Sequence, residues 1–210
     1  EARGDALWGA LVAAGAERVD LLVVPELTVP PADRAALIRR LRWADPAAPR
    51  PALIVPGSFH EQVGDRFVHR AVVLDGATGN ALAVHDKLAP YGELDGFAED
   101  IALGDEITVL VTPIGTVAVA ICKDFCDDHV GALWHQVQPE WLLVPAFGRG
   151  ASAHEQAAHR IARMAGTVTA LAHQGDPATG VETRSFVHDG TTCHPAQSVA
   201  PALSVHNIAR

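Results

Sequence analysis

The sequence predicts an α/β domain in which helices cover the faces of mixed β-sheets, and three observations support this fold class. Apolar runs of strand length alternate with segments of helix length along most of the chain. Two pairs of apolar runs are joined by turn sequences, which predicts antiparallel hairpins beside parallel strands. No repeat, low-complexity block or linker divides residues 1–210, so we expect one domain with a core of about residues 5–175.

The first half of the chain predicts two helices and four strands. Residues 5–16 predict a short helix that ends near Gly15, and residues 32–43 predict a helix with one apolar face. Apolar runs of strand length occur at 19–24, 52–55, 67–74 and 81–85. The last two runs flank residues 75–80, which combine Asp, Gly and Asn and therefore predict a hairpin.

The second half continues the alternation up to about residue 175. Strands are expected at 107–111, 116–121, 141–144 and 167–172, and the first two flank a Pro-Ile-Gly turn. One helix is expected after Asp127 or Asp128 as its N-cap. A second helix is expected to begin with a capping box of Ser152 and Glu155 and to stop at Gly166. Residues 176–210 form a tail to which we assign no element.

Composition excludes several functional classes. The chain has 25 acidic against 16 basic residues and a formal net charge of −9, which argues against nucleic acid or an anionic membrane as the main partner. The longest nearly uncharged apolar run, residues 6–16, is shorter than the roughly 20 residues of a membrane-spanning helix. The 3 cysteines cannot all pair within one chain, which favours a reducing compartment and hence a cytoplasmic location.

Three chemically reactive residues follow predicted strands. Glu26, Lys87 and Cys122 each come shortly after an apolar run, and strand ends are where sites assemble in layered α/β folds. A thiol that attacks, a carboxylate that moves protons and an ammonium that stabilises an oxyanion suit acyl transfer. Taken singly, each residue has a structural alternative: a solvated acid, a surface cation or an inert buried thiol.

The ionisation state of the Cys122 thiol is not fixed by the sequence. The positive end of the following helix and the neighbouring Lys123 favour the thiolate. Three nearby acids oppose it, namely Asp124, Asp127 and Asp128.

The segments around these residues resemble the carbon–nitrogen hydrolase (nitrilase) superfamily over about residues 5–175. The order Glu, Lys, Cys and the spacing between the three residues agree with that family. The resemblance rests on Pro25-Glu26, His85-Asp86-Lys87-Leu88, residues 119–125, Gly104-Asp105-Glu106, residues 112–115, 141–147 and 160–165.

This resemblance implies an α-β-β-α sandwich and a Glu-Lys-Cys triad that cleaves an amide, N-carbamoyl compound or nitrile. Cys122 would be the nucleophile, Glu26 the general base and acid, and Lys87 the oxyanion partner, helped by the backbone N–H of Lys123. Many members have a second glutamate after the lysine, for which Glu93 is the first candidate and Glu99 the second. The family implies no metal or organic cofactor and points to a homo-oligomer.

Some family features are missing. The first family strand is not found before Asp5, and the closing Gly- and Ser-containing motif is not found in 183–210. Lys123 stands where the family often has Tyr, and His173-Gln174 stands where it often has Asn-Gln. These departures weaken inferences about substrate and about the tail, but they leave the three triad residues in place.

Several alternatives stay open. A zinc site is a weak alternative, with Cys122, Cys126 and His129 as ligands and Cys193-His194 completing the set. The fold also suits a relative of the N-acyltransferases, or an inactive domain used for interaction. Trp134 and Trp141 are candidates for an association surface, and core positions are the structural alternative.

Overall fold

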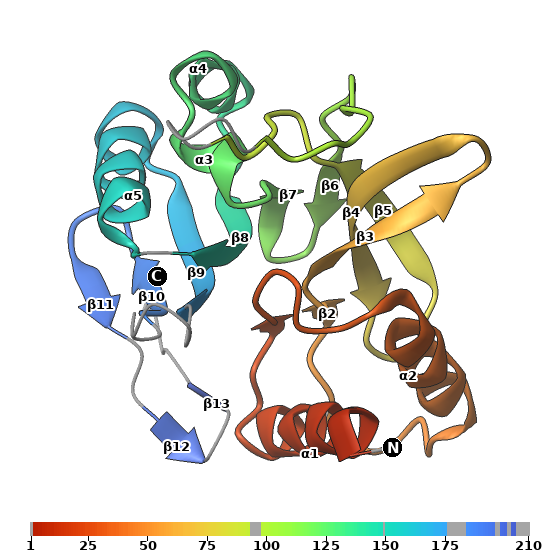
Figure 1. Cartoon of the computed structure of the whole chain (residues 1–210). Helices are drawn as coiled ribbons and strands as arrows, with labels where there is room; N and C mark the ends of the chain where they lie inside the picture. The colour runs from red at the N-terminus through yellow and green to blue at the C-terminus, as the bar shows by residue number, and fades with distance from the viewer. Residues whose placement is uncertain are drawn as a thin grey trace.

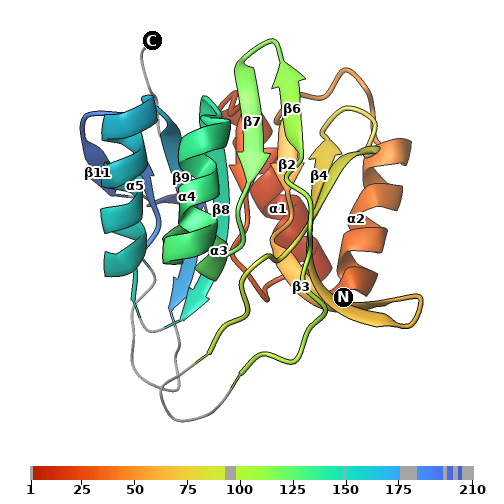
Figure 2. The same ribbon diagram turned by 90° about the horizontal axis from the view of Figure 1, so that it is seen from above.

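The computed structural model describes residues 2–92, 98–148, 150–175, 184–195, 198–200 and 203–204, which form four layers. Two β-sheets face each other, and helices cover the outer face of each, as Figure 2 shows. Helices α1 (Ala2–Ala16) and α2 (Pro31–Trp43) lie on one side, and α4 (Asp128–Val137) and α5 (Ser152–Ala165) lie on the other. The predicted α-β-β-α sandwich is therefore confirmed.

The first sheet has the strand order β1-β2-β4-β3, with β5 also paired to β4. Its strands are β1 (Leu21–Val23), β2 (Leu53–Val55), β3 (Ser58–Val63), β4 (Arg66–Asp75) and β5 (Ala81–Asp86). Strands β1 and β2 are parallel, whereas β4 runs antiparallel to β2, β3 and β5. The pattern did not predict β3, because this edge strand is mostly polar and only partly buried.

The second sheet has the order β11-β10-β9-β8-β7-β6. Its strands are β6 (Val109–Thr112), β7 (Gly115–Val119), β8 (Trp141–Gly148), β9 (Val168–Gly175), β10 (Phe186–His188) and β11 (Cys193–Pro195). The central strands β7, β8 and β9 are parallel, and the flanking strands are antiparallel. Both hairpins that the turn sequences predicted are present, β4–β5 and β6–β7.

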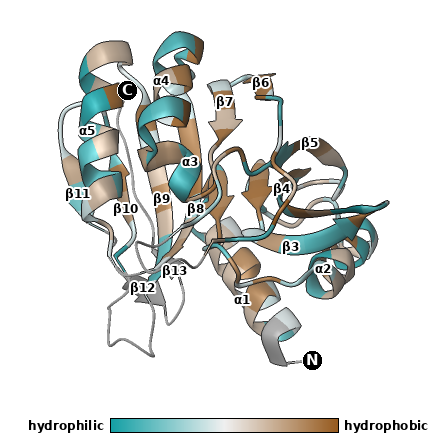
Figure 3. Cartoon of the chain, turned by 45° about the horizontal axis from the view of Figure 1, so that its top comes forward, coloured by the Kyte–Doolittle hydropathy of each residue, from teal (hydrophilic) through white to brown (hydrophobic). Residues whose placement is uncertain are grey.

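Alternating side chains of the strands divide the core into two clusters. Ile54 of β2 and Leu74 of β4 pack with α1 and α2, whereas Leu53, Val55 and Val73 pack with the second sheet. Successive side chains of a strand point to opposite faces, so each central strand of the first sheet contributes to both clusters. Figure 1 shows the order of the elements, and Figure 3 shows hydrophobic residues concentrated on the inner strands.

Two of the expected helix boundaries are confirmed and one is wrong. Asp127 caps α4 by accepting hydrogen bonds from the N–H groups of His129 and Val130, and Gly166 ends α5 with φ 69°. The capping box at Ser152 is wrong, because Ala151 occupies the N-cap of α5 and no side chain caps that end.

The tail contributes strands that the sequence pattern did not predict. Strand β10 adds to β9, β11 adds to β10, and β12 (Ser198–Ala200) pairs with β13 (Leu203–Ser204). With three residues or fewer in each, these strands are too short to show a periodic pattern. None of the described helices combines the length and apolarity that a membrane crossing requires.

Candidate active site

Glu26 and Lys87 meet in the interior, although 61 positions separate them in the sequence. Glu26 follows β1 and Lys87 directly follows β5, and the Lys87 Nζ donates to Glu26 Oε1 at 3.0 Å. Only 4% of Glu26 and 2% of Lys87 is exposed to solvent. Burial alone would lower the pKa of Lys87, but the negative charges of Glu26 and Glu99 raise that pKa above its ordinary value. Lys87 is therefore a fixed cation.

Cys122 lies on the tight turn between β7 and the one-turn helix α3 (Lys123–Cys126), with φ 44° and ψ −98°. A positive φ is strained for a residue with a side chain, and such strain persists only where the surroundings fix it. Here the Cys122 N–H donates to the Pro145 carbonyl at 2.9 Å, and its carbonyl accepts from the Phe125 N–H at 3.1 Å. The sulfur lies 3.5 Å from the Phe147 carbonyl oxygen.

The charges of both Glu26 and Lys87 act on the Cys122 thiol, so the structure brings the three residues together. Burial, reinforced by Glu26, raises the pKa of the thiol well above its ordinary value, and Lys87 only partly opposes this. The Cys122 thiol is thus neutral in the resting protein. The Lys123 side chain pairs with Asp127 at 3.8 Å.

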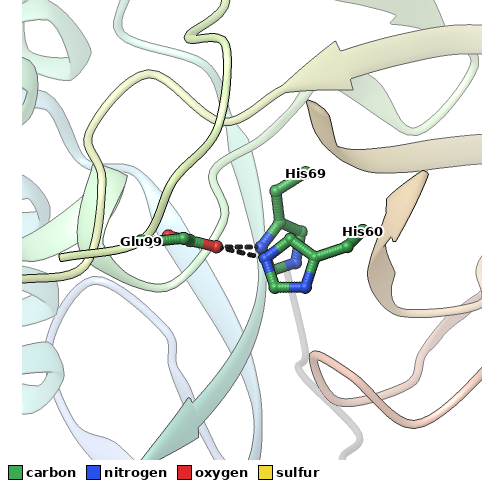
Figure 4. A group of neighbouring side chains, drawn as sticks. All are labelled: His60, His69 and Glu99. Carbon is green, nitrogen blue, oxygen red and sulfur yellow. Dashed lines mark hydrogen bonds and ion pairs between the residues drawn. The ribbon is translucent and has the colours of Figure 1, made fainter. Parts of the chain in front are cut away.

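Glu99 is the second carboxylate at Lys87, and its two oxygens accept four hydrogen bonds. Oε2 accepts from Lys87 Nζ at 2.9 Å and from the Tyr91 N–H at 3.0 Å. Oε1 accepts from His60 and His69, each at 2.6 Å, as Figure 4 shows. Burial would raise the pKa of Glu99, but the histidine hydrogen bonds and the Lys87 charge hold it far below its usual range. A second glutamate thus lies at the lysine, although it is the residue ranked second; Glu93 lies outside the described residues.

Asp124 joins the lysine segment to the cysteine turn, a role that its position in the sequence did not predict. Its Oδ1 accepts from the N–H groups of Leu88 at 2.8 Å and Ala89 at 2.7 Å. Its Oδ2 accepts from the Ile121 N–H at 3.1 Å and from His85 Nε2 at 3.0 Å. The carboxylate is fully buried. The sequence showed only an acid near the thiol, because the Leu88 and Ala89 N–H groups that it binds lie about 35 residues away along the chain.

The residues that depart from the family pattern also lie close to the site. The buried His173 experiences the charge of Glu26, and burial lowers its pKa. Its neighbour Gln174 accepts a hydrogen bond from Thr28 Oγ1 at 2.9 Å, which ties β9 to the segment after Glu26. The ring of His154 lies near that of His173, with centroids 6.3 Å apart and an angle of 56° between the ring planes.

The alternative zinc site at Cys122, Cys126 and His129 is not assembled. Within the part of the chain that the structure describes, the one group of three converging metal-ligand atoms comes from His60, His69 and Glu99. The proposed surface role of Trp134 is also wrong. Trp134 is 1% exposed and donates its Nε1–H to the Asp124 carbonyl at 3.0 Å, so it is a core residue.

No family model matches the chain, and no curated protein matches it. Among solved structures, it is similar to a Cys-to-Ser variant of an amidase of the nitrilase superfamily from Nesterenkonia AN1, with 18% identity and TM-score 0.70 over 91% of this chain and 81% of that one. A Glu-to-Gln, Cys-to-Ala variant of the amidase from Nesterenkonia sp. AN1, in complex with acrylamide, has 19% identity and TM-score 0.72 over 92% and 78%. A Glu-to-Gln variant of that amidase, with the acetamide moiety of fluoroacetamide added covalently at its active-site cysteine, has 20% identity and TM-score 0.70 over 91% and 77%. The chain therefore has the fold of nitrilase-superfamily amidases.

Proposed function

We propose that the chain is a thiol hydrolase of the nitrilase superfamily that cleaves a non-peptide C–N bond through Glu26, Lys87 and Cys122. The observation that carries this proposal is the buried Glu26–Lys87 ion pair at 3.0 Å, whose charges both act on a cysteine held in a strained turn. Strained backbone and charged groups inside the protein are typical of active sites. A domain used only for interaction gains nothing from this burial of charge.

In the first half of the reaction, Cys122 Sγ attacks the carbonyl carbon of an amide while Glu26 accepts the thiol proton. The carbonyl electron pair moves to oxygen, where the Lys87 ammonium and the Lys123 backbone N–H stabilise the negative charge. Lys123 is the first residue of α3, where N–H groups have no partner within the helix. Glu26 then protonates the nitrogen, the C–N bond breaks, and ammonia leaves a thioester on Cys122.

In the second half, Glu26 accepts a proton from water while the water oxygen attacks the thioester carbon. The C–S bond breaks, the carboxylic acid is released, and the proton returns to the Cys122 sulfur. Because Lys87 keeps its charge throughout, it stabilises both oxyanions without entering the proton transfers. Glu99 holds the Lys87 ammonium from a second side.

We take small uncharged amides as the first substrate class to test. Each of the three side chains is at most 6% exposed, which suits a small reactive group better than a polypeptide. The Nesterenkonia amidase has been solved with acrylamide and with butyramide, which supports this choice for a chain of the same fold. N-carbamoyl compounds and nitriles belong in the same panel. We also propose that the chain forms a homo-oligomer in the cytoplasm. Size-exclusion chromatography with light scattering tests the oligomeric state.

The experiment is ammonia release from this panel by the wild-type chain and by two matched variants. Glu26→Gln keeps the shape of the side chain but cannot accept the thiol proton, so turnover should fall by at least about a hundredfold. Glu17→Gln changes an exposed acid and should leave turnover unchanged. Equal turnover in wild type and Glu26→Gln would contradict the general-base role.

A second assay separates the alternatives in reaction type. When a primary amine is added with the amide, an N-acyltransferase forms a new amide in preference to the free acid. An inactive interaction domain releases no ammonia and forms no thioester on Cys122, which intact-mass spectrometry detects. We expect the free acid as the main product, because a hydrolase needs no second binding site for an acceptor amine.

A further inference from the structure

We propose that His60, His69 and Glu99 form a binding site for a divalent transition-metal ion such as zinc. The ligand atoms of the three residues converge on one point (Figure 4), and Glu99 also accepts a hydrogen bond from Lys87 at 2.9 Å. The hydrolysis proposed above does not need such an ion. The inference concerns an added, inhibitory site, and only its effect on turnover rests on the proposed function.

The two histidines are held together by the first sheet. His60 on β3 and His69 on β4 are direct register partners of an antiparallel pair, and their ring centroids lie 4.3 Å apart. Directly opposed side chains on paired strands have closely spaced Cβ atoms, and strands position ligands more accurately than loops do. Two imidazoles are therefore already close together before any ion binds.

Glu99 brings the third ligand atom to the same point. His60 Nε2 and His69 Nδ1 each lie 2.6 Å from Glu99 Oε1, and the three ligand atoms lie within 4.8 Å of one another. Zinc binds imidazole nitrogen and carboxylate oxygen at about 2.0–2.2 Å, so modest side-chain shifts make room for it. Two nitrogens and one oxygen suit zinc, cobalt or copper better than magnesium or calcium, which prefer all-oxygen sites.

The surroundings also meet the other needs of a metal site. When His69 Nδ1 binds the ion, its proton moves to Nε2, which faces Ser58 Oγ at 3.0 Å and Glu26 Oε1 at 3.5 Å. Metal-bound histidines usually donate their second N–H to such a group. His69 is completely buried, but 29% of the His60 side chain is exposed, which gives ions access and leaves space for a water ligand.

Metal binding at this point should weaken the interaction that holds the Lys87 ammonium in place. The Glu99 oxygen that does not face the histidines accepts from Lys87 Nζ at 2.9 Å. A divalent cation on Glu99 weakens its attraction for the Lys87 ammonium and adds positive charge close to it. Zinc should therefore inhibit amide hydrolysis, and a chelator should reverse the inhibition.

The direct test uses the wild-type chain and does not depend on activity. Cobalt(II) is titrated while its visible absorption is followed, and X-ray absorption spectroscopy is then recorded on the zinc-loaded protein. We expect one equivalent of bound metal, with two imidazoles and oxygen ligands around it. Absence of stoichiometric binding overturns the proposal, and so does a sulfur ligand, which would place the metal on Cys122.

Variants then separate metal ligation from hydrogen bonding. His60→Gln places an amide N–H near the position of Nε2, so it keeps a donor to Glu99 but cannot replace the imidazole as a metal ligand; we expect at least tenfold weaker cobalt binding. Cys122→Ser should bind as wild type does. The control His194→Ala removes an exposed histidine that also pairs with a carboxylate, Asp189, at 2.6 Å, and it should not change binding. Unchanged binding in His60→Gln, or loss in either of the other two variants, refutes the assignment. If no amide is hydrolysed at all, the proposed function fails while this binding test stands.

Discussion

Replacement of Asp124 by asparagine tests whether one buried carboxylate holds the lysine segment against the cysteine turn. Its four hydrogen bonds, at 2.7–3.1 Å, connect Leu88, Ala89, Ile121 and His85. Asparagine has a single oxygen, which can keep the bonds to Leu88 and Ala89 without the charge. Its NH₂ group then faces the Ile121 N–H, donor against donor.

The expected loss of stability follows from these contacts. An unpartnered buried N–H costs about 1–3 kcal/mol, and bonds to a charged acceptor are roughly twice as strong as neutral ones, so two weakened bonds add about 1 kcal/mol each. His85 can accept from the new NH₂ group only by moving its proton to Nδ1, which is buried without a hydrogen-bond partner, so this exchange offsets none of the loss. The free energy of unfolding should therefore fall by about 3–5 kcal/mol, a large part of the roughly 5–15 kcal/mol typical of a domain.

Urea unfolding followed by tryptophan fluorescence measures this change, because Trp134 donates to the Asp124 carbonyl. The midpoint should fall with an unchanged slope. The matched control is Asp127→Asn, because asparagine also caps helices well and the free energy of unfolding should change by less than about 1 kcal/mol. An equally small change in Asp124→Asn would refute the bridging role.

Three further predictions concern titration and thiol reactivity. Burial, with His173, lowers the pKa of His154 to about 4, so between pH 7 and 5 the unfolded chain binds a proton that the folded chain does not. In urea titrations, the fall in the free energy of unfolding over this range should be about 2 kcal/mol smaller in His154→Leu than in the wild type, because His173, whose pKa burial also lowers, contributes to the fall in both. Replacement of the exposed His129 by leucine is the control and should leave the fall as in the wild type. The pKa of Glu99 is held far below its usual range, so its contribution to the free energy of unfolding is complete above about pH 4.3 and is lost as the pH falls further. Glu99→Gln should therefore reduce the loss of stability at acid pH and lower turnover about a hundredfold. A loss of stability or a turnover equal to that of the wild type would count against the network. The exposed Cys193 should react before Cys122 with a charged disulfide reagent, as intact-mass spectrometry would show, and faster labelling of Cys122 would contradict its protonated, buried state.

The sequence predicted the elements that carry a strong period and missed those that do not. The helix at residues 32–43 and the hairpin around 75–80 were confirmed closely, as Pro31–Trp43 and as β4–β5. Strand β3 was missed because it is polar and lies at an edge of its sheet. Its omission removed His60 from consideration, although His60 contacts the second carboxylate at Lys87.

The sequence singled out three candidate residues but not the groups that surround and hold them. Glu26, Lys87 and Cys122 each follow a strand, and the structure brings them together. Their partners are set by long-range packing, as with the Asp124 bonds to segments about 35 residues away. Burial also decided the state of the thiol, which charge counting along the chain left open.

The bridge made by Asp124 has a consequence for how far such chains can diverge. Three of its four partners are main-chain amides, at Leu88, Ala89 and Ile121, which every amino acid except proline possesses. Substitution at these three positions can therefore alter the side chains without removing a single bond of the bridge. Main-chain bonds of this kind keep the local geometry while side chains vary, which is compatible with a fold shared at only 18–20% identity.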